Sequence, residues 1–433
     1  MKIENFLKDR FGMFIHWGAY SVNGRSEWAR CHERITIEDY QKYVDNFNPK
    51  ENCTRQWAKI AKDAGMKYAV LTTKHHDGFC LFNSDYTDYS TYHTIGRDLV
   101  REFVDAFREE GIQIGFYYSV IDWYHPDYPT YQDLQHPRRD CLKEKEQEPH
   151  RNLATYIDYL HNQVRELLTN YGKIDIMWFD FSYNNPSESG LPAMKGETWE
   201  ATKLVKMIRE LQPDCIFNNR LGSNSGMLVA EPEFYAGDFT SPEQIVPPQG
   251  MLNELGEVVP WESCITMTSS WCYTQNFYSY KSTKTLIRAL IECVSKNGNL
   301  LLNVGPTAKG DIPAVCVQTL AEMGQWLKAN GESIYGCQAS SFAKPDWGRF
   351  TQKGNKLYAH ILERGIGPIP LIGLEGKIES AKLLIDGVLM KLDRPWNVTK
   401  FPNDAFLPLP WFDALPDENA TVVELTLKEE LDS

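Results

Sequence analysis

Asp180 closes a short apolar run, residues 174–179, that has the character of a buried β-strand. The residues after it are turn formers without a helical period. Because an α/β barrel keeps its catalytic groups at the carboxyl ends of its strands, Asp180 is a candidate catalytic carboxylate. Trp178, two residues earlier, points to the same side of the strand. An indole beside a carboxylate suits a sugar, which offers hydroxyl groups and an apolar C–H face. The alternative is that Asp180 only caps the following loop.

Other polar residues stand at the ends of neighbouring predicted strands. They are His16, His75, His76, Tyr118 and Arg220. The carboxyl ends of consecutive barrel strands meet at one mouth, so this series predicts a functional site there. Imidazoles, a phenol, a guanidinium, an indole and carboxylates together have the composition of a sugar site.

The three histidines raise the alternative of a metal centre. The first strand, however, carries one histidine and not the His-x-His pair that barrel metallohydrolases usually supply. His75 and His76 point to opposite sides if their strand stays extended, whereas a metal needs converging ligands. No glycine-rich dinucleotide fingerprint and no phosphate-binding loop occurs in the sequence. We therefore expect neutral imidazoles that bind hydroxyl groups, with no metal and no cofactor.

Cleavage of a glycoside needs two carboxyl groups, which lie about 5–5.5 Å apart in retaining enzymes. Asp180, on a rigid strand end, is the natural nucleophile. Glu27, Glu243 and Glu262 are the candidate proton donors, and the residues alone do not choose among them. Glu243 lies in a proline-rich loop able to approach the barrel mouth from above, where a donor with a raised pKa is wanted. Glu262 follows a tryptophan and precedes a strand, so a purely structural role is equally open.

Strands and helices alternate over the first three quarters of the chain. The predicted strands are residues 12–16, 66–76, 112–119, 174–179, 215–220, 264–268 and 299–304, and the predicted helices are 37–47, 53–64, 98–110, 152–170, 198–211, 283–295 and 313–330. The connections are too long for hairpins and indicate parallel βαβ units. This count favours a (β/α)8-like barrel over a doubly wound sheet. Residues 122–150 and 221–260 are predicted to be irregular.

The pattern changes near Tyr335-Gly336. Residues 348–362 read as a β-hairpin with Gly354-Asn355 at its turn, and residues 378–392 and 420–427 add further strands. We predict a catalytic domain over residues 1–335 and a small β-sandwich over residues 336–433. The second domain is expected to pack against the first.

Composition limits the classes of partner. The chain has 433 residues, 42% of them hydrophobic and 12% aromatic, which allows a large core and a ring-lined sugar site. A net charge of −13 argues against nucleic acid and anionic membranes as partners. The 10 scattered cysteines indicate buried reduced thiols. The N-terminal residues lack the apolar core of a signal peptide and no apolar run is long enough to span a membrane, so a cytoplasmic location is expected; a trimmed secreted protein has the same appearance. A homo-oligomer is left open.

Taken together and in order, the motifs resemble those of glycoside hydrolase family 29, the α-L-fucosidases, over about residues 8–335. They are Phe14-Ile-His16-Trp17-Gly18, Ser26-Glu27-Trp28, Lys74-His75-His76-Asp77-Gly78-Phe79, Phe116-Tyr-Tyr118-Ser119, Trp178-Phe-Asp180, Asn219-Arg220, Gly237-Asp-Phe-Thr-Ser-Pro-Glu243, Trp261-Glu262 and Ser270-Trp271. The resemblance implies a barrel enzyme that removes terminal α-L-fucose from glycans with retention, without metal or cofactor. It implies Asp180 as the nucleophile. It also implies fucose-binding roles for His16, His75, His76, Tyr118, Trp178 and Arg220, with Glu27 and Trp28 nearby and Trp271 on the methyl side of the sugar.

The acid/base is the variable feature of that family. One branch places it at the position of Glu243, and another at the position of Glu262, followed by a different run of residues. The sequence after Glu262 departs from that run, so Glu243 is favoured and Glu262 is kept as the alternative. Cys272 replaces the glycine usual after the Ser-Trp pair, which puts only substrate detail in doubt. The alternatives for function are a retaining enzyme that prefers α-L-galactosides or transfers fucose, and an inactive fucose-binding protein.

Overall fold

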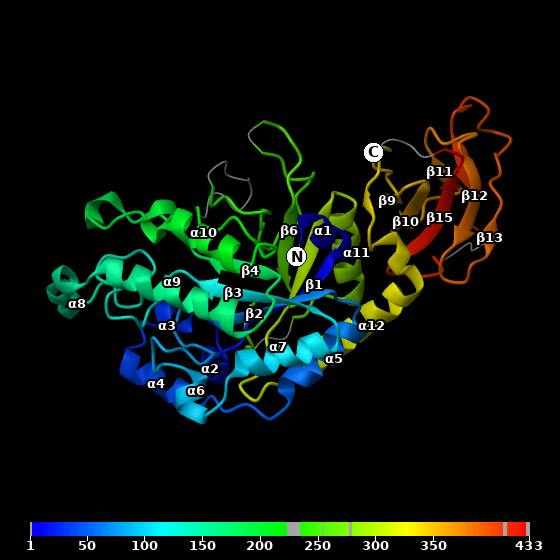
Figure 1. Cartoon of the computed structure of the whole chain (residues 1–433). Coiled ribbons are helices and arrows are strands. Elements are labelled where there is room, and N and C mark those ends of the chain that lie inside the picture. The colour runs from blue at the N-terminus through cyan, green and yellow to red at the C-terminus, as the bar shows by residue number, and fades with distance from the viewer. Residues whose placement is uncertain (1, 223–233, 254, 277–278, 410–413, 430–433) are drawn as a thin grey trace.

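The computed structural model describes residues 2–222, 234–253, 255–276, 279–409 and 414–429 of the chain. Parallel strands and helices form the larger part. Antiparallel strands form a smaller part beside helices α11 (Thr283–Val294) and α12 (Ala314–Asn330) (Figure 1). Among these described residues, no helix is both long and apolar enough to cross a membrane.

The larger part is built on a parallel sheet of seven strands in the order β5-β4-β3-β2-β1-β7-β6. The strands are β1 (Phe11–Ile15), β2 (Tyr68–Lys74), β3 (Gln113–Ser119), β4 (Ile176–Asp180), β5 (Ile216–Phe217), β6 (Trp261–Thr266) and β7 (Gly298–Val304). Nearly every residue of these strands is buried, because helices cover one face and the barrel interior the other. This is why the strands read as apolar runs in the sequence.

Residues 239–243 take the eighth place and close the ring between β5 and β6. The parallel bridges are Asn218 to Phe239, Thr240 to Trp261 and Glu243 to Cys264. Backbone hydrogen bonds from Asp238 N to Phe217 O (2.8 Å) and from Glu262 N to Thr240 O (2.9 Å) join the two sides. The predicted (β/α)8-like barrel is confirmed, with an irregular stretch as its eighth member.

Helices surround the barrel. They are α1 (Ile3–Asp9), α2 (Tyr20–Asn23), α3 (Ala29–His32), α4 (Ile37–Asn46), α5 (Cys53–Asp63), α6 (Thr91–Ile95), α7 (Leu99–Glu109), α8 (Leu142–Gln147), α9 (Leu153–Asn170) and α10 (Ala201–Leu211), followed by α11 and α12. α7 shows why the sequence pattern succeeds: the Asp98 carboxylate accepts from Arg101 N (2.8 Å) at its start, and Gly111 takes a positive φ of 70° just after its end. Its apolar face, which includes Phe103 and Phe107, is fully buried.

Two local features differ from the sequence prediction. α8 lies inside the stretch 122–150; it buries none of its six residues and so has no apolar period to detect. β5 has only two residues because the Asn218 side chain takes over the pairing with β4: its Oδ1 accepts from Phe179 N (3.0 Å) and its Nδ2 donates to Phe179 O (2.9 Å).

The interior of the barrel is filled by side chains from alternate positions of the strands, including Phe14, Tyr68, Tyr117 and Trp178. α1 closes the amino-terminal end of the strands. The ring of its Phe6 lies 5.3 Å from that of Tyr68. Only the carboxyl ends of the strands are therefore left to form a mouth, where barrel enzymes hold their sites.

The smaller part is all-β. Its six-stranded antiparallel sheet has the order β13-β12-β15-β10-β9-β8, and β11 pairs with β14 in a second sheet. The strands are β8 (Gln338–Ala339), β9 (Gly348–Lys353), β10 (Lys356–Ile361), β11 (Ile369–Leu371), β12 (Ile378–Leu383), β13 (Leu389–Met390), β14 (Ala405–Leu407) and β15 (Thr421–Leu427). The predicted hairpin is present as β9–β10, with Gly354 at a φ of 57°.

The two parts pack together as predicted. Trp326 Nε1 of α12 donates to Ala420 O (3.0 Å), and Arg288 Nε of α11 donates to Asn419 O (3.1 Å). Ala420 and Val422 belong to the same buried cluster as the barrel helices. The domain boundary after residue 335 stays a prediction.

Candidate active site

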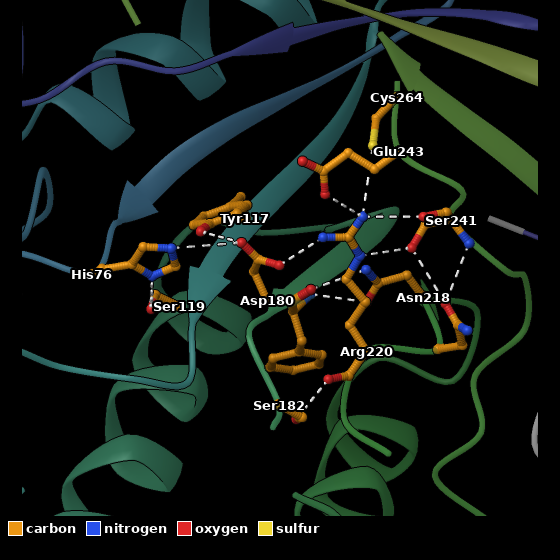
Figure 2. A network of polar contacts seen from close by, with 12 residues as sticks. His76, Tyr117, Ser119, Asp180, Ser182, Asn218, Arg220, Ser241, Glu243 and Cys264 are labelled. Carbon is orange, nitrogen blue, oxygen red and sulfur yellow. Dashed lines mark hydrogen bonds and ion pairs between the residues drawn. The ribbon is translucent and has the colours of Figure 1, made fainter. Parts of the chain in front are cut away.

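Asp180 is the last residue of β4 and lies almost buried at the barrel mouth. Its Oδ1 accepts from Arg220 Nη1 (2.8 Å), and its Oδ2 accepts from Tyr117 Oη (2.7 Å) (Figure 2). Phe181, the next residue, has a φ of 82°, a strained backbone conformation for a large side chain. The chain thus turns sharply out of the strand and leaves the carboxylate facing the mouth, held from both sides.

Arg220 joins two carboxylates. Besides Asp180, its Nη2 donates to Glu243 Oε2 (3.0 Å), and its Nε donates to Ser241 Oγ (3.0 Å). Figure 2 shows the guanidinium between the two carboxyl groups. Burial acts against the charge of Arg220, but Asp180 and Glu243 outweigh it and raise its pKa. Two carboxyl groups on one guanidinium are necessarily close, as a double displacement on a glycoside requires.

Trp178 supports this arrangement from the barrel interior. The Arg220 guanidinium carbon lies 4.4 Å from the centre of its ring, a cation–π contact. The indole also stacks on Tyr117, with ring centres 5.7 Å apart. Trp178 does face the same side of β4 as Asp180, as predicted, but it is only 1% exposed and covered by Arg220. It is placed to position Arg220 beneath the site.

Tyr117, and not the predicted Tyr118, faces the site. The sequence assigned Tyr118 to the site, whereas it is the Tyr117 hydroxyl that reaches Asp180. Tyr118 points out of the barrel towards α9, and its hydroxyl donates to Gln163 Oε1 (2.8 Å). Side chains alternate along a strand, and in β3 the inward positions are those of Tyr117 and Ser119. Placement of Tyr118 at the mouth is therefore wrong, and Tyr117 takes its place.

Two of the predicted histidines are oriented by partners on neighbouring strands. His16 Nδ1 lies 2.6 Å from Asn303 Oδ1 of β7, and His76 Nδ1 lies 2.7 Å from Ser119 Oγ of β3. Burial lowers the pKa of both imidazoles to about 3. They are therefore neutral at pH 7, with each second ring nitrogen left for another partner.

His75 and His76 lie on the same side, contrary to the prediction from an extended strand. β2 ends at Lys74, before the two histidines, and their ring centres are only 4.1 Å apart. His75 also stacks on Tyr117, with ring centres 5.5 Å apart. His76 Nε2 lies 3.9 Å from Asp180 Oδ2. Within the described ranges, no group of three or more His, Cys, Asp or Glu side chains is arranged to hold a metal ion.

Aromatic rings border the two sides of the site. Trp28 packs against His76 and Phe181, with ring centres 4.9 and 5.2 Å away. Trp271 lies on the other side, 4.9 Å from the His16 ring. Partly exposed tryptophans on either side of hydroxyl-binding groups suit the apolar faces of a sugar.

Glu27 is buried and tied to the chain that carries Trp271. Its Oε2 accepts from Cys272 N (3.2 Å) and lies 3.5 Å from Ser270 Oγ. Burial raises the pKa of Glu27. This carboxyl positions the segment around Trp271, and it is not among the groups that contact Asp180.

The two candidate acid/base residues differ in position. The Glu243 side chain is 34% exposed and reaches the mouth through Arg220. Glu262, in contrast, is 1% exposed and lies inside the barrel, where its Oε2 accepts from Tyr68 Oη. Burial raises the pKa of Glu262 to about 8. Of the two, only Glu243 shares a cation with Asp180.

Four residues of the site were not assigned a role from the sequence: Tyr117, Ser119, Ser241 and Asn303. Tyr117 was detectable, since it stands beside the residue chosen. The other three are small polar residues within or next to apolar runs. Their partners lie on other strands, so no local pattern reveals them.

A closed α/β barrel with two carboxyl groups and neutral imidazoles at its mouth has the architecture of a glycoside hydrolase. A family model described as Alpha-L-fucosidase matches residues 2–332, and the chain belongs to this family. It is 31% identical over 361 residues to the plasma alpha-L-fucosidase of Homo sapiens, covering 76% of this chain and 68% of that protein.

Solved structures agree with this assignment. Alpha-L-fucosidase isoenzyme 1 from Paenibacillus thiaminolyticus is 56% identical with a TM-score of 0.93, and the match covers 99% of each chain. A GH29 alpha-L-fucosidase from Bacteroides thetaiotaomicron, described as a trapped covalent intermediate with 2-fluoro-fucosyl fluoride, is 27% identical with a TM-score of 0.81; the match covers 98% of this chain and 95% of that one.

Proposed function

We propose that this chain is a retaining exo-α-L-fucosidase that hydrolyses terminal fucose from fucosylated oligosaccharides or glycoconjugates. Family membership supports the reaction class. The observation that carries the proposal for this chain is the Arg220 guanidinium, which holds Asp180 and Glu243 together at the barrel mouth. A double displacement needs one carboxylate as nucleophile and a second, nearby carboxyl group as acid/base.

In the first step, Asp180 attacks the anomeric carbon of fucose while Glu243 gives a proton to the departing glycosidic oxygen. The glycosidic C–O bond breaks and a covalent fucosyl ester forms on Asp180. In the second step, Glu243 takes a proton from water, and the resulting hydroxide attacks the anomeric carbon. The ester bond breaks and Asp180 is regenerated as a carboxylate. Two inversions return fucose in its original configuration.

Tyr117 and Arg220 keep the nucleophile in place through both steps. The Tyr117 hydroxyl stays protonated because burial, followed by the charge of Asp180, holds its pKa well above the usual range. It therefore donates to Asp180 at every pH suited to the enzyme. Arg220 contacts both carboxyl groups, so its positive charge stabilises whichever of them is ionised at each step. Fixed donors of this kind need no reorganisation during the reaction.

Recognition of the sugar is assigned to the groups that surround Asp180. His16, His75 and His76 are neutral and bind ring hydroxyls, and Arg220 adds a charged donor. Trp28 and Trp271 border the ring, with Trp271 on the side of the methyl group. Tyr117 replaces Tyr118 in this set, and Trp178 acts beneath it by supporting Arg220.

The proposal is tested with 4-nitrophenyl α-L-fucoside and its α-L-galactoside analogue, followed by NMR of the first-formed sugar. We expect turnover of the fucoside with initial release of the α-anomer. Release of the β-anomer, faster turnover of the galactoside, or binding of fucose without turnover each contradicts it. Product analysis with α1,2-, α1,3-, α1,4- and α1,6-fucosylated oligosaccharides then identifies the linkage and separates hydrolysis from transfer to a sugar acceptor.

A reducing compartment is part of the proposal. All ten cysteines of the chain are unpaired, and nine of them are buried. Buried free thiols are typical of proteins kept in a reducing environment such as the cytoplasm. A mass shift of two hydrogens per disulfide after isolation under non-reducing conditions contradicts this placement.

A further inference from the structure

Glu262 is a buried acid that the double displacement does not use. It is the second residue of β6, well before the end of that strand at the mouth, and its side chain is enclosed by residues of three other strands. Tyr68 of β2 donates to its Oε2, Asn299 of β7 lies opposite it in the strand register, and Trp178 of β4 lies against it. The carboxyl group thus sits one layer below the catalytic residues.

Three polar atoms in this layer have no hydrogen-bond partner of good geometry: Glu262 Oε1, Trp178 Nε1 and Asn299 Oδ1. Their chemistry is complementary. The indole N–H is a donor only, the Asn299 oxygen is an acceptor only, and a protonated carboxyl group is both. A neutral Glu262 therefore satisfies both neighbours after a small adjustment, whereas an ionised one has no proton to offer Asn299. Unpaired buried polar groups are costly, which favours the neutral form.

The layer connects directly to the catalytic groups. Trp178 presents its ring face to Arg220 at 4.4 Å, and Arg220 in turn donates to Asp180 at 2.8 Å and to Glu243 at 3.0 Å. The indole N–H edge is buried on the Glu262 side of the ring. Any rotation of the indole moves the surface on which the guanidinium rests. The orientation of the indole therefore affects the position of Arg220, and with it the spacing between the carboxyl groups of Asp180 and Glu243.

We propose that Glu262 is a positioning residue for the hydrolysis: in its neutral form it links Asn299 to the Trp178 indole, and so holds the indole, and through it Arg220, in the arrangement that presents Asp180 and Glu243 to the substrate. The inference rests on the proposed function, because it assigns Glu262 a role in that reaction other than acid/base. Ionisation of Glu262 removes the proton that it offers to Asn299, so the carboxyl group loses its link to β7 and places a negative charge beside the indole.

The groups that face Glu262 do not supply a positive charge that stabilises its ionised form. They are Tyr68 of β2, Trp178 of β4, Cys264 of β6 and Asn299 of β7. Burial is the largest influence on Glu262 and raises its pKa to about 8, against the opposing effects of Tyr68 and Trp178. The neutral form is thus present at pH 6 and is lost in mildly alkaline solution.

The test compares Glu262→Gln, Glu262→Leu and the wild-type enzyme by the pH dependence of kcat/KM. The substrate is 4-nitrophenyl α-L-fucoside, whose leaving group departs without a proton, so kcat/KM does not depend on the acid. Glutamine reproduces the donor and acceptor of a neutral carboxyl group and has no ionisation. We expect Glu262→Gln to keep at least about a third of the wild-type kcat/KM at pH 6. Its kcat/KM should stay level where that of the wild type falls, near pH 8.

Glu262→Leu removes both polar functions, and we expect a decrease of 10-fold or more in kcat at pH 6 with KM changed less than about 3-fold. Thermal unfolding and circular dichroism establish that each variant is folded. Glu166→Gln is the matched control, because Glu166 is another buried acid, bonded to Ser84 and Asp85 (2.8 and 2.7 Å) away from the site. Its pH profile should equal that of the wild type.

Three results overturn the inference. Recovery of the Glu262→Leu or Glu262→Gln rate by azide identifies Glu262 as the acid/base. Wild-type kcat in a folded Glu262→Leu variant removes any positioning role. If kcat/KM decreases equally at alkaline pH in the wild type and in Glu262→Gln, the decrease is caused by the ionisation of another group. Failure of the proposed function itself is seen separately, as a wild-type enzyme without activity on the fucoside.

Discussion

The adjacent residues Tyr117 and Tyr118 allow a sharp test of the site, because the structure separates them by function. Replacement of Tyr117 by phenylalanine removes the 2.7 Å hydrogen bond to Asp180 and leaves the ring in place. A hydrogen bond to a charged group contributes about 1.5–3 kcal/mol. Since each 1.36 kcal/mol is a factor of ten in rate, kcat/KM should fall about 10- to 160-fold.

Tyr118→Phe is the matched control on the other face of the same strand. It removes the 2.8 Å bond to Gln163 and leaves the Gln163 oxygen unpaired in a buried place. Such a loss lowers the free energy of unfolding by about 1–3 kcal/mol. No contact with Asp180 changes, so kcat/KM should stay within about 3-fold of wild type while the urea midpoint decreases.

The assay measures kcat/KM with 4-nitrophenyl α-L-fucoside at a temperature where both variants are fully folded, together with urea unfolding of each. The reasoning is refuted if Tyr118→Phe loses activity and Tyr117→Phe retains it. It is also refuted if both lose activity equally while both remain folded. The first result would place Tyr118 in the site, as predicted from the sequence.

Three further predictions concern the acid/base, the cation and the histidines. Azide or formate should restore the rate of Glu243→Ala by 10-fold or more and leave Glu262→Ala unaffected; the reverse pattern exchanges their roles. Arg220→Met should lower kcat/KM at least 100-fold, because it leaves two acidic groups without their buried counter-ion; a decrease below 5-fold contradicts the bridging role. His76 has a folded-state pKa of about 3 against an ordinary 6.5, so the unfolded chain binds the extra proton between these values. The free energy of unfolding should therefore decrease as pH falls from 6.5, by about 1.4 kcal/mol per pH unit for this group. Urea unfolding at several pH values should show a smaller dependence of this free energy on pH for His76→Gln than for the wild type. An equal dependence in the two proteins contradicts the prediction.

The barrel was predictable from the sequence because its elements are locally encoded. β4 reads as an apolar run closed by Asp180, and α7 carries a cap at Asp98, an apolar stripe and a terminal glycine. The eighth barrel member could not be recognised in the same way. Residues 239–243 include Pro242 and pair only through isolated bridges, to Asn218 beside β5 and to β6, so no apolar run marks them as a strand.

The site was predicted as a cluster but not in its orientations. Which of Tyr117 and Tyr118 faces inward depends on the registry of β3, and the β2–β3 pairing shifts by one residue between Thr72 and Lys74. The convergence of His75 and His76 depends on the end of β2 at Lys74. Pairings between distant strands determine both, and a single-residue shift reverses the face of every side chain.

The dependence on pairings between distant strands also explains why the sequence did not distinguish the roles of Glu243 and Glu262. Glu243 and Glu262 both lie beside strand-like residues, so their local sequences allow either one to be the proton donor. Their depth in the barrel separates them: Glu243 meets Arg220 at the mouth, and Glu262 meets Tyr68 in the interior. Depth follows from the tilt and stagger of the closed sheet, which no local pattern contains.

The central claim is that Asp180 carries the sugar during turnover, and peptide mass spectrometry after reaction with 2-deoxy-2-fluoro-α-L-fucosyl fluoride tests it most directly. Fluorine slows breakdown of the covalent intermediate, so the labelled enzyme can be digested and sequenced. We predict one fluorofucosyl group per chain, attached to Asp180, and no label on Asp180→Asn. A label on Glu243 or Glu262, or inactivation without a covalent adduct, contradicts the account.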